Sequence, residues 1–358
     1  MPPAPSVPVG PALGRLRVRR RRLLRLAVVL SVIAVEIVLV APHLSASGAA
    51  LDHVKWGWVA AAVACEVASI ATFARLRRSL LRAGGLPVPL GQMGALTLAS
   101  NAIAVTAPAG LVVSAGYLYR QLRRLGASAP LITWTLAAGA VISTATFSVI
   151  TVAGTLLDDD TSVGAIAGTA GLSLLAVFGL IALLTVVTHH PRPVLNALRS
   201  MCRRLPGRRA RSCPDNDEKA VDRLAAQITA ITPRLGDWSA AFWFSLLNWL
   251  ADLACFVLCC YAVGVTQLGL GAAMVAYVAG LATTSISLLP AGIGSLEAGM
   301  LVGLTHGGVA TPLAVAGIVI YRLVSYALVA AVGWVVWAAL RRRFAGDRLT
   351  APQPELLG

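Results

Sequence analysis

Negative charge is scarce in this chain of 358 residues, which has 15 Asp and Glu against 30 Lys and Arg. Charged residues of both signs make up 13% of the chain, apolar residues make up 57%, and the mean hydropathy is +0.78. Soluble globular domains have about 25% charged and about 45–50% apolar residues. The composition therefore excludes an ordinary soluble domain and favours a polytopic membrane protein.

Motifs for metal binding and for common hydrolytic or nucleotide chemistry are also missing. The six Cys have neither a Cys-x-x-Cys spacing nor a neighbouring His, which indicates packing residues rather than a zinc site or a disulfide framework. There is no Gly-x-Ser-x-Gly elbow, no His-Glu-x-x-His and no P-loop. We therefore expect no metal, no cofactor and no enzyme activity, with an intramembrane enzyme acting on a lipid-linked substrate as the open alternative.

What the chain does have is a strong clustering of positive charge. Every Lys and Arg except Lys55 and Arg322 falls into one of five clusters, at residues 15–25, 75–82, 120–124, 192–234 and 341–348. Short basic segments beside apolar spans stay in the cytoplasm. The clusters therefore predict a cytoplasmic-membrane protein with both termini inside, and they explain the net charge of +15 without nucleic acid.

Six apolar segments are long enough to cross a bilayer, at residues 23–41, 56–74, 131–157, 163–187, 238–263 and 312–340. The first of them could be a secretory signal, because Ser45-Ala46-Ser47 resembles a cleavage site. Its length and the presence of Glu36 favour an uncleaved helix instead. The expected fold class is all-α, a polytopic membrane protein with about six full spans.

Two further apolar regions, residues 86–119 and 268–306, are broken by Gly and Pro. The first has basic clusters on both sides, so it must cross the membrane an even number of times to keep both clusters inside. The second must also cross an even number of times, because the last cluster at residues 341–348 is placed inside. Irregular backbone at membrane depth needs protein or a wet cavity around it. We therefore predict two re-entrant helical hairpins, the first entering from inside and the second from outside; a pair of tight full spans is the alternative for the first.

The two broken regions share a short motif, Pro108-Ala-Gly110 in the first and Pro290-Ala-Gly292 in the second. Related breaks on opposite sides of the bilayer are typical of an inverted-topology repeat. This repeat divides the chain into a basic tail, a first membrane half, a basic cytoplasmic loop, a second membrane half and a C-terminal tail, at residues 1–22, 23–187, 188–237, 238–340 and 341–358.

Five ionisable residues lie at membrane depth: Glu36, Glu66, Asp252, Glu297 and Arg322. A charge there costs about 3 kcal/mol on insertion scales, so each one needs a partner or a polar pocket. Arg322 and Glu297 are predicted either to hold the phosphate and the cationic group of a lipid headgroup or to form a structural ion pair. Glu66 and Asp252 precede the two hairpins, where proton coupling and helix–helix hydrogen bonding are the alternatives. Asn101 is expected to satisfy backbone groups at the first hairpin turn.

The second hairpin motif, Ser287-Leu-Leu-Pro-Ala-Gly-Ile-Gly-Ser-Leu-Glu-Ala-Gly, and the later Tyr321-Arg322-Leu323 resemble the lysylphosphatidylglycerol synthase transmembrane region, a flippase-like integral membrane family. The segment from Asn101 through Pro108-Ala-Gly110 to Tyr119-Arg120 fits the other motif of this family. The resemblance covers residues 24–340. It implies two opposed re-entrant halves that translocate aminoacylated or other amphiphilic phospholipids, with functional positions at Pro290, Gly292, Gly294, Glu297 and Arg322.

The first hairpin departs from the motif, because Leu-Val-Val-Ser follows Gly110 without a second glycine or an acidic residue. Two-domain members carry a soluble aminoacyltransferase domain after the membrane region, and only a short tail follows here, so synthase activity is not expected. The hypothesis is a flippase-like lipid transporter whose partners are a phospholipid and the membrane. The alternative is a non-transporting membrane anchor or regulator of a lipid- or cell-wall-modifying enzyme that uses residues 192–234. Whether the chain forms a homodimer is left open.

Overall fold

A computed structural model describes residues 53–107, 109–158, 163–189, 233–284, 292 and 294–350. Within these ranges all regular structure is helical, as expected for the all-α class. The elements are α3 (Trp56–Ala83), α4 (Leu90–Thr106), α5 (Gly110–Arg124), α6 (Ala129–Leu157), α7 (Val163–His189), α10 (Leu235–Ala262), α11 (Leu270–Thr284), α12 (Ser295–His306), α13 (Thr311–Arg322), the π-helical turn η3 (Leu323–Leu328) and α14 (Val329–Thr350).

Four of the described helices are long and apolar enough to cross a membrane: α3, α6, α10 and the continuous run Thr311–Arg342 through α13, η3 and α14. They coincide with four of the six predicted spans, and α7 forms where the span at residues 163–187 was predicted. The predicted span at residues 23–41, with Glu36, lies outside the described residues. Large apolar side chains such as Leu172, Leu175 and Val335 are about 70% exposed, which suits contact with lipid tails.

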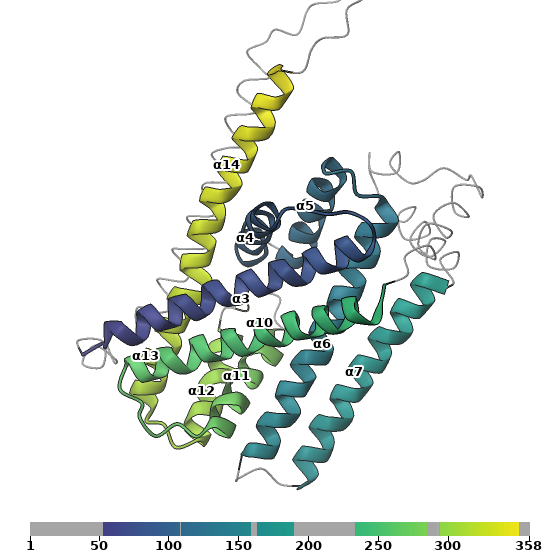
Figure 1. Ribbon diagram of the computed structural model, residues 1–358. Helices are drawn as coiled ribbons and strands as arrows, with labels where there is room; N and C mark the ends of the chain where they lie inside the picture. The colour runs from purple at the N-terminus through teal and green to yellow at the C-terminus, as the bar shows by residue number, and fades with distance from the viewer. Residues whose placement is uncertain are drawn as a thin grey trace, which may run out of the picture. The chain divides into compact units, whose positions relative to one another are not determined.

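Helices α3 and α10 lie side by side along most of their length (Figure 1). The Lys55 backbone N–H at the start of α3 donates to the Ala262 carbonyl at the end of α10, at 2.9 Å, so the two helices are antiparallel. Farther along, the Ser69 hydroxyl donates to Asn248 Oδ1 at 3.1 Å. This antiparallel pair brings residues of the two membrane halves together.

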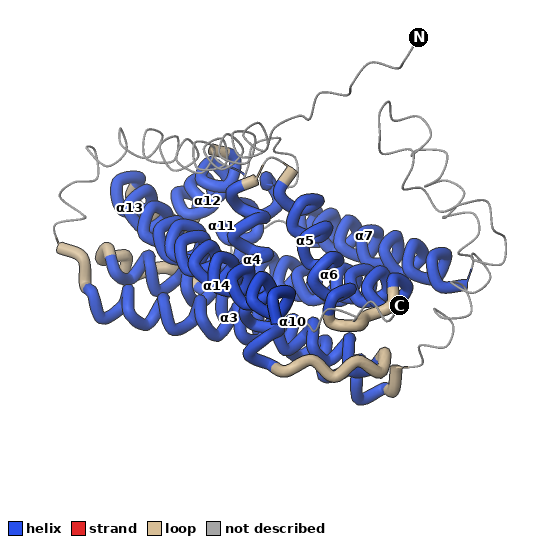
Figure 2. Tube along the Cα trace, turned by 90° about the horizontal axis from the view of Figure 1, so that it is seen from above, coloured by secondary structure: helices blue, strands red, loops and turns tan. Residues whose placement is uncertain are grey.

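The first broken region is a hairpin of α4 and α5, which pack on each other. Its break has Ala109 in the left-handed region, with φ 52°. Gly110 follows because a Cβ there would collide with the backbone oxygen of Ala104. Helix α14 runs across α4, where Gly333 allows the close approach (Figure 2). A buried apolar cluster that includes Leu96 fills the space between this hairpin, α3 and α6.

The second broken region is a hairpin of α11 and α12, packed through small residues. A Cβ added at Gly299 would lie 2.6 Å from the Ala279 carbonyl oxygen, and one added at Gly303 would collide with Ala276. Such small-residue contacts let membrane helices approach closely. A second buried apolar cluster surrounds this hairpin together with α10 and α13. All four hairpin helices have 12 to 17 residues, fewer than the roughly 20 that a straight crossing needs.

Candidate functional site

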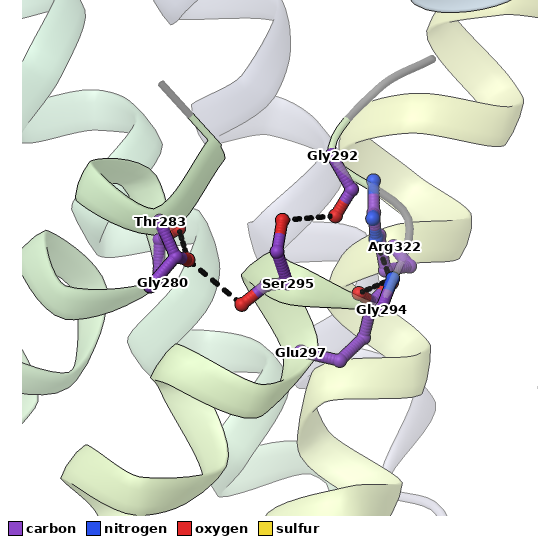
Figure 3. A network of polar contacts seen from close by, with 7 residues as sticks. All are labelled: Gly280, Thr283, Gly292, Gly294, Ser295, Glu297 and Arg322. Carbon is purple, nitrogen blue, oxygen red and sulfur yellow. Dashed lines mark hydrogen bonds and ion pairs between the residues drawn. The ribbon is translucent and has the colours of Figure 1, made fainter. Parts of the chain in front are cut away.

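The start of α12 is built around a glycine and an acid three residues apart. Gly294, the residue before the helix, has φ 82°, a value that favours glycine. Its backbone N–H donates to Glu297 Oε2 at 2.7 Å (Figure 3). A carboxylate in the first turn caps the helix and interacts favourably with its dipole. The Gly-x-x-Glu spacing in the sequence is therefore the spacing of a helix cap.

The second oxygen of Glu297 holds an arginine from α13. Arg322 Nε donates to Glu297 Oε1 at 2.5 Å, and the two form an ion pair (Figure 3). The side chain of Arg322 is 8% exposed and that of Glu297 30% exposed. The guanidinium carbon also lies 4.2 Å from the ring centroid of Tyr326, within the range of a cation–π contact. The structure thus forms the ion pair that the sequence predicts as one of two alternatives, and the lipid-headgroup site stays a prediction.

A chain of hydroxyl contacts connects the two helices of the second hairpin beside this ion pair. Thr283 Oγ1 lies 2.6 Å from the Gly280 carbonyl oxygen and 2.7 Å from that of Ser295. Ser295 Oγ in turn donates to the Gly292 carbonyl at 3.0 Å (Figure 3). Gly292 has φ 62°, and a Cβ there would lie 2.6 Å from Thr284 Cγ2. Pro290 lies outside the described residues.

A second polar cluster is centred on Asp252 of α10. Its Oδ2 accepts a hydrogen bond from the Tyr277 hydroxyl at 2.6 Å, and its Oδ1 accepts one from the Tyr321 hydroxyl at 3.1 Å. The Ser325 hydroxyl lies 3.1 Å from Glu66 Oε2 and 3.5 Å from Asp252 Oδ1. Glu66 and Asp252, predicted at equivalent places before the two hairpins, therefore meet through one hydroxyl group.

The two clusters are joined by the end of α13 and the π-helical turn η3. Tyr321 of the Asp252 cluster directly precedes Arg322 of the ion pair. The turn η3 contributes Ser325 to the Asp252 cluster and Tyr326 to the surroundings of the ion pair. The rings of Tyr321 and Tyr326 pack edge to face, with centroids 6.3 Å apart. Single π-helical turns inside α-helices occur frequently at functional sites. A change at either cluster would therefore act on the same short segment of backbone.

The first hairpin does not reproduce this arrangement. Asn101 lies inside α4, before its end at Thr106, and its side chain forms no hydrogen bond with a described residue. Its predicted role at the turn stays a prediction. Pro108 lies outside the described residues, and Gly110 opens α5. A charged residue that contacts this hairpin is Arg77 of α3, whose Nη1 donates to two hydroxyls of α4.

Sequence reasoning missed several of these polar residues, among them Arg77, Tyr277 and Ser325. Arg77 counts as one more member of a basic cluster that sets topology. Tyr277 could have been noticed as the one hydroxyl-bearing aromatic residue in an otherwise apolar run. Ser325 carries no signal, because its position depends on the π-helical turn.

Nothing in the described part of the chain points to a metal centre, since it has no group of three or more His, Cys, Asp or Glu placed to hold an ion. Of the basic segment 192–234 invoked for an anchoring role, only residues 233 and 234 are described, so that alternative also stays a prediction.

A sequence model of the lysylphosphatidylglycerol synthase TM region matches residues 22–333. The chain therefore belongs to this family, as its hairpin motifs suggest, and is a membrane protein. Comparison with curated proteins gives no match.

Proposed function

We propose that this chain is a flippase-like transporter that moves an amphiphilic phospholipid, anionic or aminoacylated, across the cytoplasmic membrane. The observation that carries the proposal is the Glu297–Arg322 ion pair at the glycine-lined break of the second hairpin, in a chain of this family. In the proposal the lipid crosses unchanged, and no bond is made or broken.

The charges of the pair complement those of a phospholipid headgroup. Arg322 offers a planar fork of donors to a phosphate, and Glu297 offers an acceptor to an ammonium group. Separating a buried ion pair with nothing in its place is costly, about 3–5 kcal/mol for loss of one partner. When a headgroup inserts between the two, each residue exchanges one ionic partner for another. The pair then works as a closed gate that a headgroup of matching charge can open.

Movement would alternate between the two hairpins. We propose that they are inverted repeats, the first opening toward the cytoplasm near Gly110 and the second toward the outside near Gly292, with both termini cytoplasmic. Two features support this. Each hairpin has helices shorter than a full span, and each has its own apolar cluster, so one can shift while the other stays packed. The acyl tails would stay in the bilayer beside the exposed apolar side chains.

The test is translocation of an NBD-labelled phosphatidylglycerol in proteoliposomes, measured by dithionite quenching. Arg322→Ala and Glu297→Ala should each lower the rate at least tenfold, while Arg341→Ala, which removes an exposed arginine from α14, should leave it unchanged. Size-exclusion profiles and thermal unfolding check that the variants fold. Wild-type rates in both site variants would remove the site.

A double variant separates the lipid site from a purely structural ion pair. Glu297→Gln with Arg322→Gln replaces both charges at once and leaves no unpaired buried charge. If the pair only holds α12 to α13, the double variant should recover much of the transport that either single variant loses. If the charges bind the headgroup, the double variant should stay inactive although it folds.

We further propose that Glu66 and Asp252 couple this movement to protons. Glu66 is buried and Asp252 is partly buried, the two carboxylates reach one hydroxyl, and no Lys, Arg or His in the described part of the chain forms an ion pair with either. Two neighbouring carboxylates in a low-dielectric site do not both ionise readily, and we propose that the pair takes up and releases one proton. Because Ser325 lies in the segment that follows Arg322, gain or loss of that proton would bias the ion pair.

The coupling is tested by imposing a pH gradient on the same proteoliposomes. Wild-type translocation should change severalfold when the gradient is reversed, whereas Glu66→Gln and Asp252→Asn should translocate at one rate in both directions. Asp237→Asn, which alters a carboxylate at the start of the same helix, should keep the wild-type response. A full gradient response in Asp252→Asn would exclude the pair as the coupling site.

A further inference from the structure

Arg77 has an environment unlike that of the neighbouring arginines. Its Nη1 donates to Ser100 Oγ at 3.2 Å and to Thr97 Oγ1 at 3.5 Å, and its guanidinium carbon lies 4.2 Å from the ring centroid of Phe73. Thr97 and Ser100 are buried, with 0% and 3% exposure. Arg78, the next residue, instead donates to the Val88 carbonyl at 2.9 Å, an ordinary contact of a helix end with a loop. Arg77 is thus fixed against the first hairpin.

The positive charge of Arg77 is not neutralised by an acid in the described part of the chain. Its partners there are two neutral hydroxyls and an aromatic face. Both hydrogen bonds use Nη1, and neither Nε nor Nη2 is among the buried nitrogen atoms that lack a partner. Arg77 is partly exposed, so this edge of the guanidinium, which forms no hydrogen bond with a described residue, is the part left to bind a ligand. A fork of this kind matches two oxygen atoms of a phosphate.

The depth of Arg77 suits a lipid phosphate. Helix α3 has 28 residues and is about 42 Å long, close to the roughly 40–45 Å of a bilayer with its headgroups. Arg77 precedes the end of the helix at Ala83 by six residues, or about 9 Å. The end carries a basic cluster, which the positive-inside rule places in the cytoplasm. Arg77 then lies at the boundary between the headgroups and the tails of the inner leaflet.

We propose that Arg77 binds the phosphate of a phospholipid from the inner leaflet at the base of the first hairpin, with Thr97 and Ser100 as positioning residues. The site rests on the proposed function, for which it supplies the place where a lipid is received before it reaches Glu297 and Arg322. Phe73 covers one face of the guanidinium and lowers its exposure to water, which strengthens the ionic hydrogen bonds to the phosphate.

Binding is measured with the purified full-length chain in a phosphate-free detergent, by calorimetric titration with dihexanoyl phosphatidylglycerol. Arg77→Gln should weaken binding about ten- to a hundredfold, the loss expected for one or two charge-assisted hydrogen bonds. Arg75→Gln is the matched control, because it removes the same charge from the same turn of α3 without a hydroxyl partner, and it should bind like wild type. Equal loss in the two variants would overturn the site in favour of general attraction to the basic cluster.

Further arms separate the sources of phosphate and the role of the hydroxyls. Dihexanoylglycerol, which lacks the phosphate, should not bind in an Arg77-dependent way, and inorganic phosphate should bind much more weakly than the lipid. Phosphate binding as tight as that of the lipid would overturn the lipid assignment. Thr97→Val with Ser100→Ala should weaken lipid binding about two- to fivefold, and Arg77→Lys should give an intermediate loss because a lysine lacks the fork.

The same titration in the Glu297→Gln, Arg322→Gln background keeps this inference separable from the proposed function. Arg77-dependent binding that persists there shows the inner site even if translocation fails. Loss of Arg77 dependence in that background would overturn the inner site as a separate one. Thermal unfolding of each variant confirms that a loss of binding is not a loss of fold.

Discussion

The two helical hairpins hold their arginines in opposite ways. Arg322 pairs with Glu297 of the second hairpin, and the same carboxylate caps the first turn of α12. One side chain therefore neutralises the arginine and satisfies a backbone N–H. Arg77 of α3, which contacts the first hairpin, is held among the described residues by two hydroxyls and an aromatic ring. The positive charge of Arg322 is therefore paired with an acid, whereas that of Arg77 has no acidic partner among the described residues.

The turns of the two hairpins differ in the same sense. The second uses glycines at its left-handed positions, with φ 62° at Gly292 and 82° at Gly294. The first places Ala109 at φ 52°, a conformation that costs a residue with a Cβ about 1–2 kcal/mol. The second turn thus uses glycine where a left-handed backbone is needed, whereas the first turn places a residue with a Cβ there. We infer that a lipid would be received at the first hairpin more readily than it would open the second.

The difference between the two hairpins should show most strongly in the free energy of unfolding when each arginine is replaced in turn. Arg322→Gln leaves Glu297 without its ionic partner in a largely buried place and should lower the free energy of unfolding by about 3 kcal/mol. Arg77→Gln should cost only about 1 kcal/mol, because glutamine can still donate to a hydroxyl. Both values come from unfolding the purified protein by titration with SDS.

The matched control for this pair is Arg341→Gln, because Arg341 is exposed and has only a distant aromatic contact, at 5.3 Å from the ring centroid of Trp337. It should change stability by less than about 0.5 kcal/mol. Equal losses in Arg322→Gln and Arg77→Gln would show that the two hairpins bind their arginines equally and would end the contrast.

A smaller effect is expected from exchanging alanine and glycine between the two turns. Ala109→Gly removes the left-handed strain and should stabilise the protein by about 0.5–1 kcal/mol after the entropy of glycine is subtracted. Gly294→Ala should destabilise it by about 1 kcal/mol, through its φ alone, because no atom lies within 4 Å of the added Cβ. The same SDS titration measures both changes.

Gly91→Ala inside α4 gives the baseline for this exchange, since it has open space and an ordinary helical backbone. It should be stabilising by up to about 1 kcal/mol. If Ala109→Gly instead lowers stability, Ala109 is not in a left-handed conformation and the first turn stores no strain.

The sequence predicted the helices better than the polar contacts between them. Long apolar runs such as those of α6 and α10 leave few alternatives to a membrane helix, so their bounds agree within a few residues. The breaks were visible because glycine and proline act locally. The meeting of Glu297 with Arg322 also followed from nearby residues, since Glu297 lies in the second hairpin and Arg322 in the helix that follows it.

The other contacts depend on how helices rotate against each other, which hydropathy does not encode. Arg77 reaches Thr97 and Ser100 only because one particular face of α3 is turned toward α4. Tyr277 reaches Asp252 across the packing of α11 against α10. Helices such as α10 and α11 are apolar nearly all round, so many rotations about the helix axis would bury a similar apolar area. The polar contacts that select one rotation are few.

The π-helical turn Leu323–Leu328 constrains chain length as well as chemistry. Such a turn contains one residue more than an α-helical turn. Removing that residue would rotate every side chain of α14 by roughly 100° relative to α13. Gly333 would then turn away from α4, where a Cβ would lie 2.7 Å from that of Ala102, and a larger residue would take its place. Evolution can therefore alter the side chains of this turn more freely than the number of its residues.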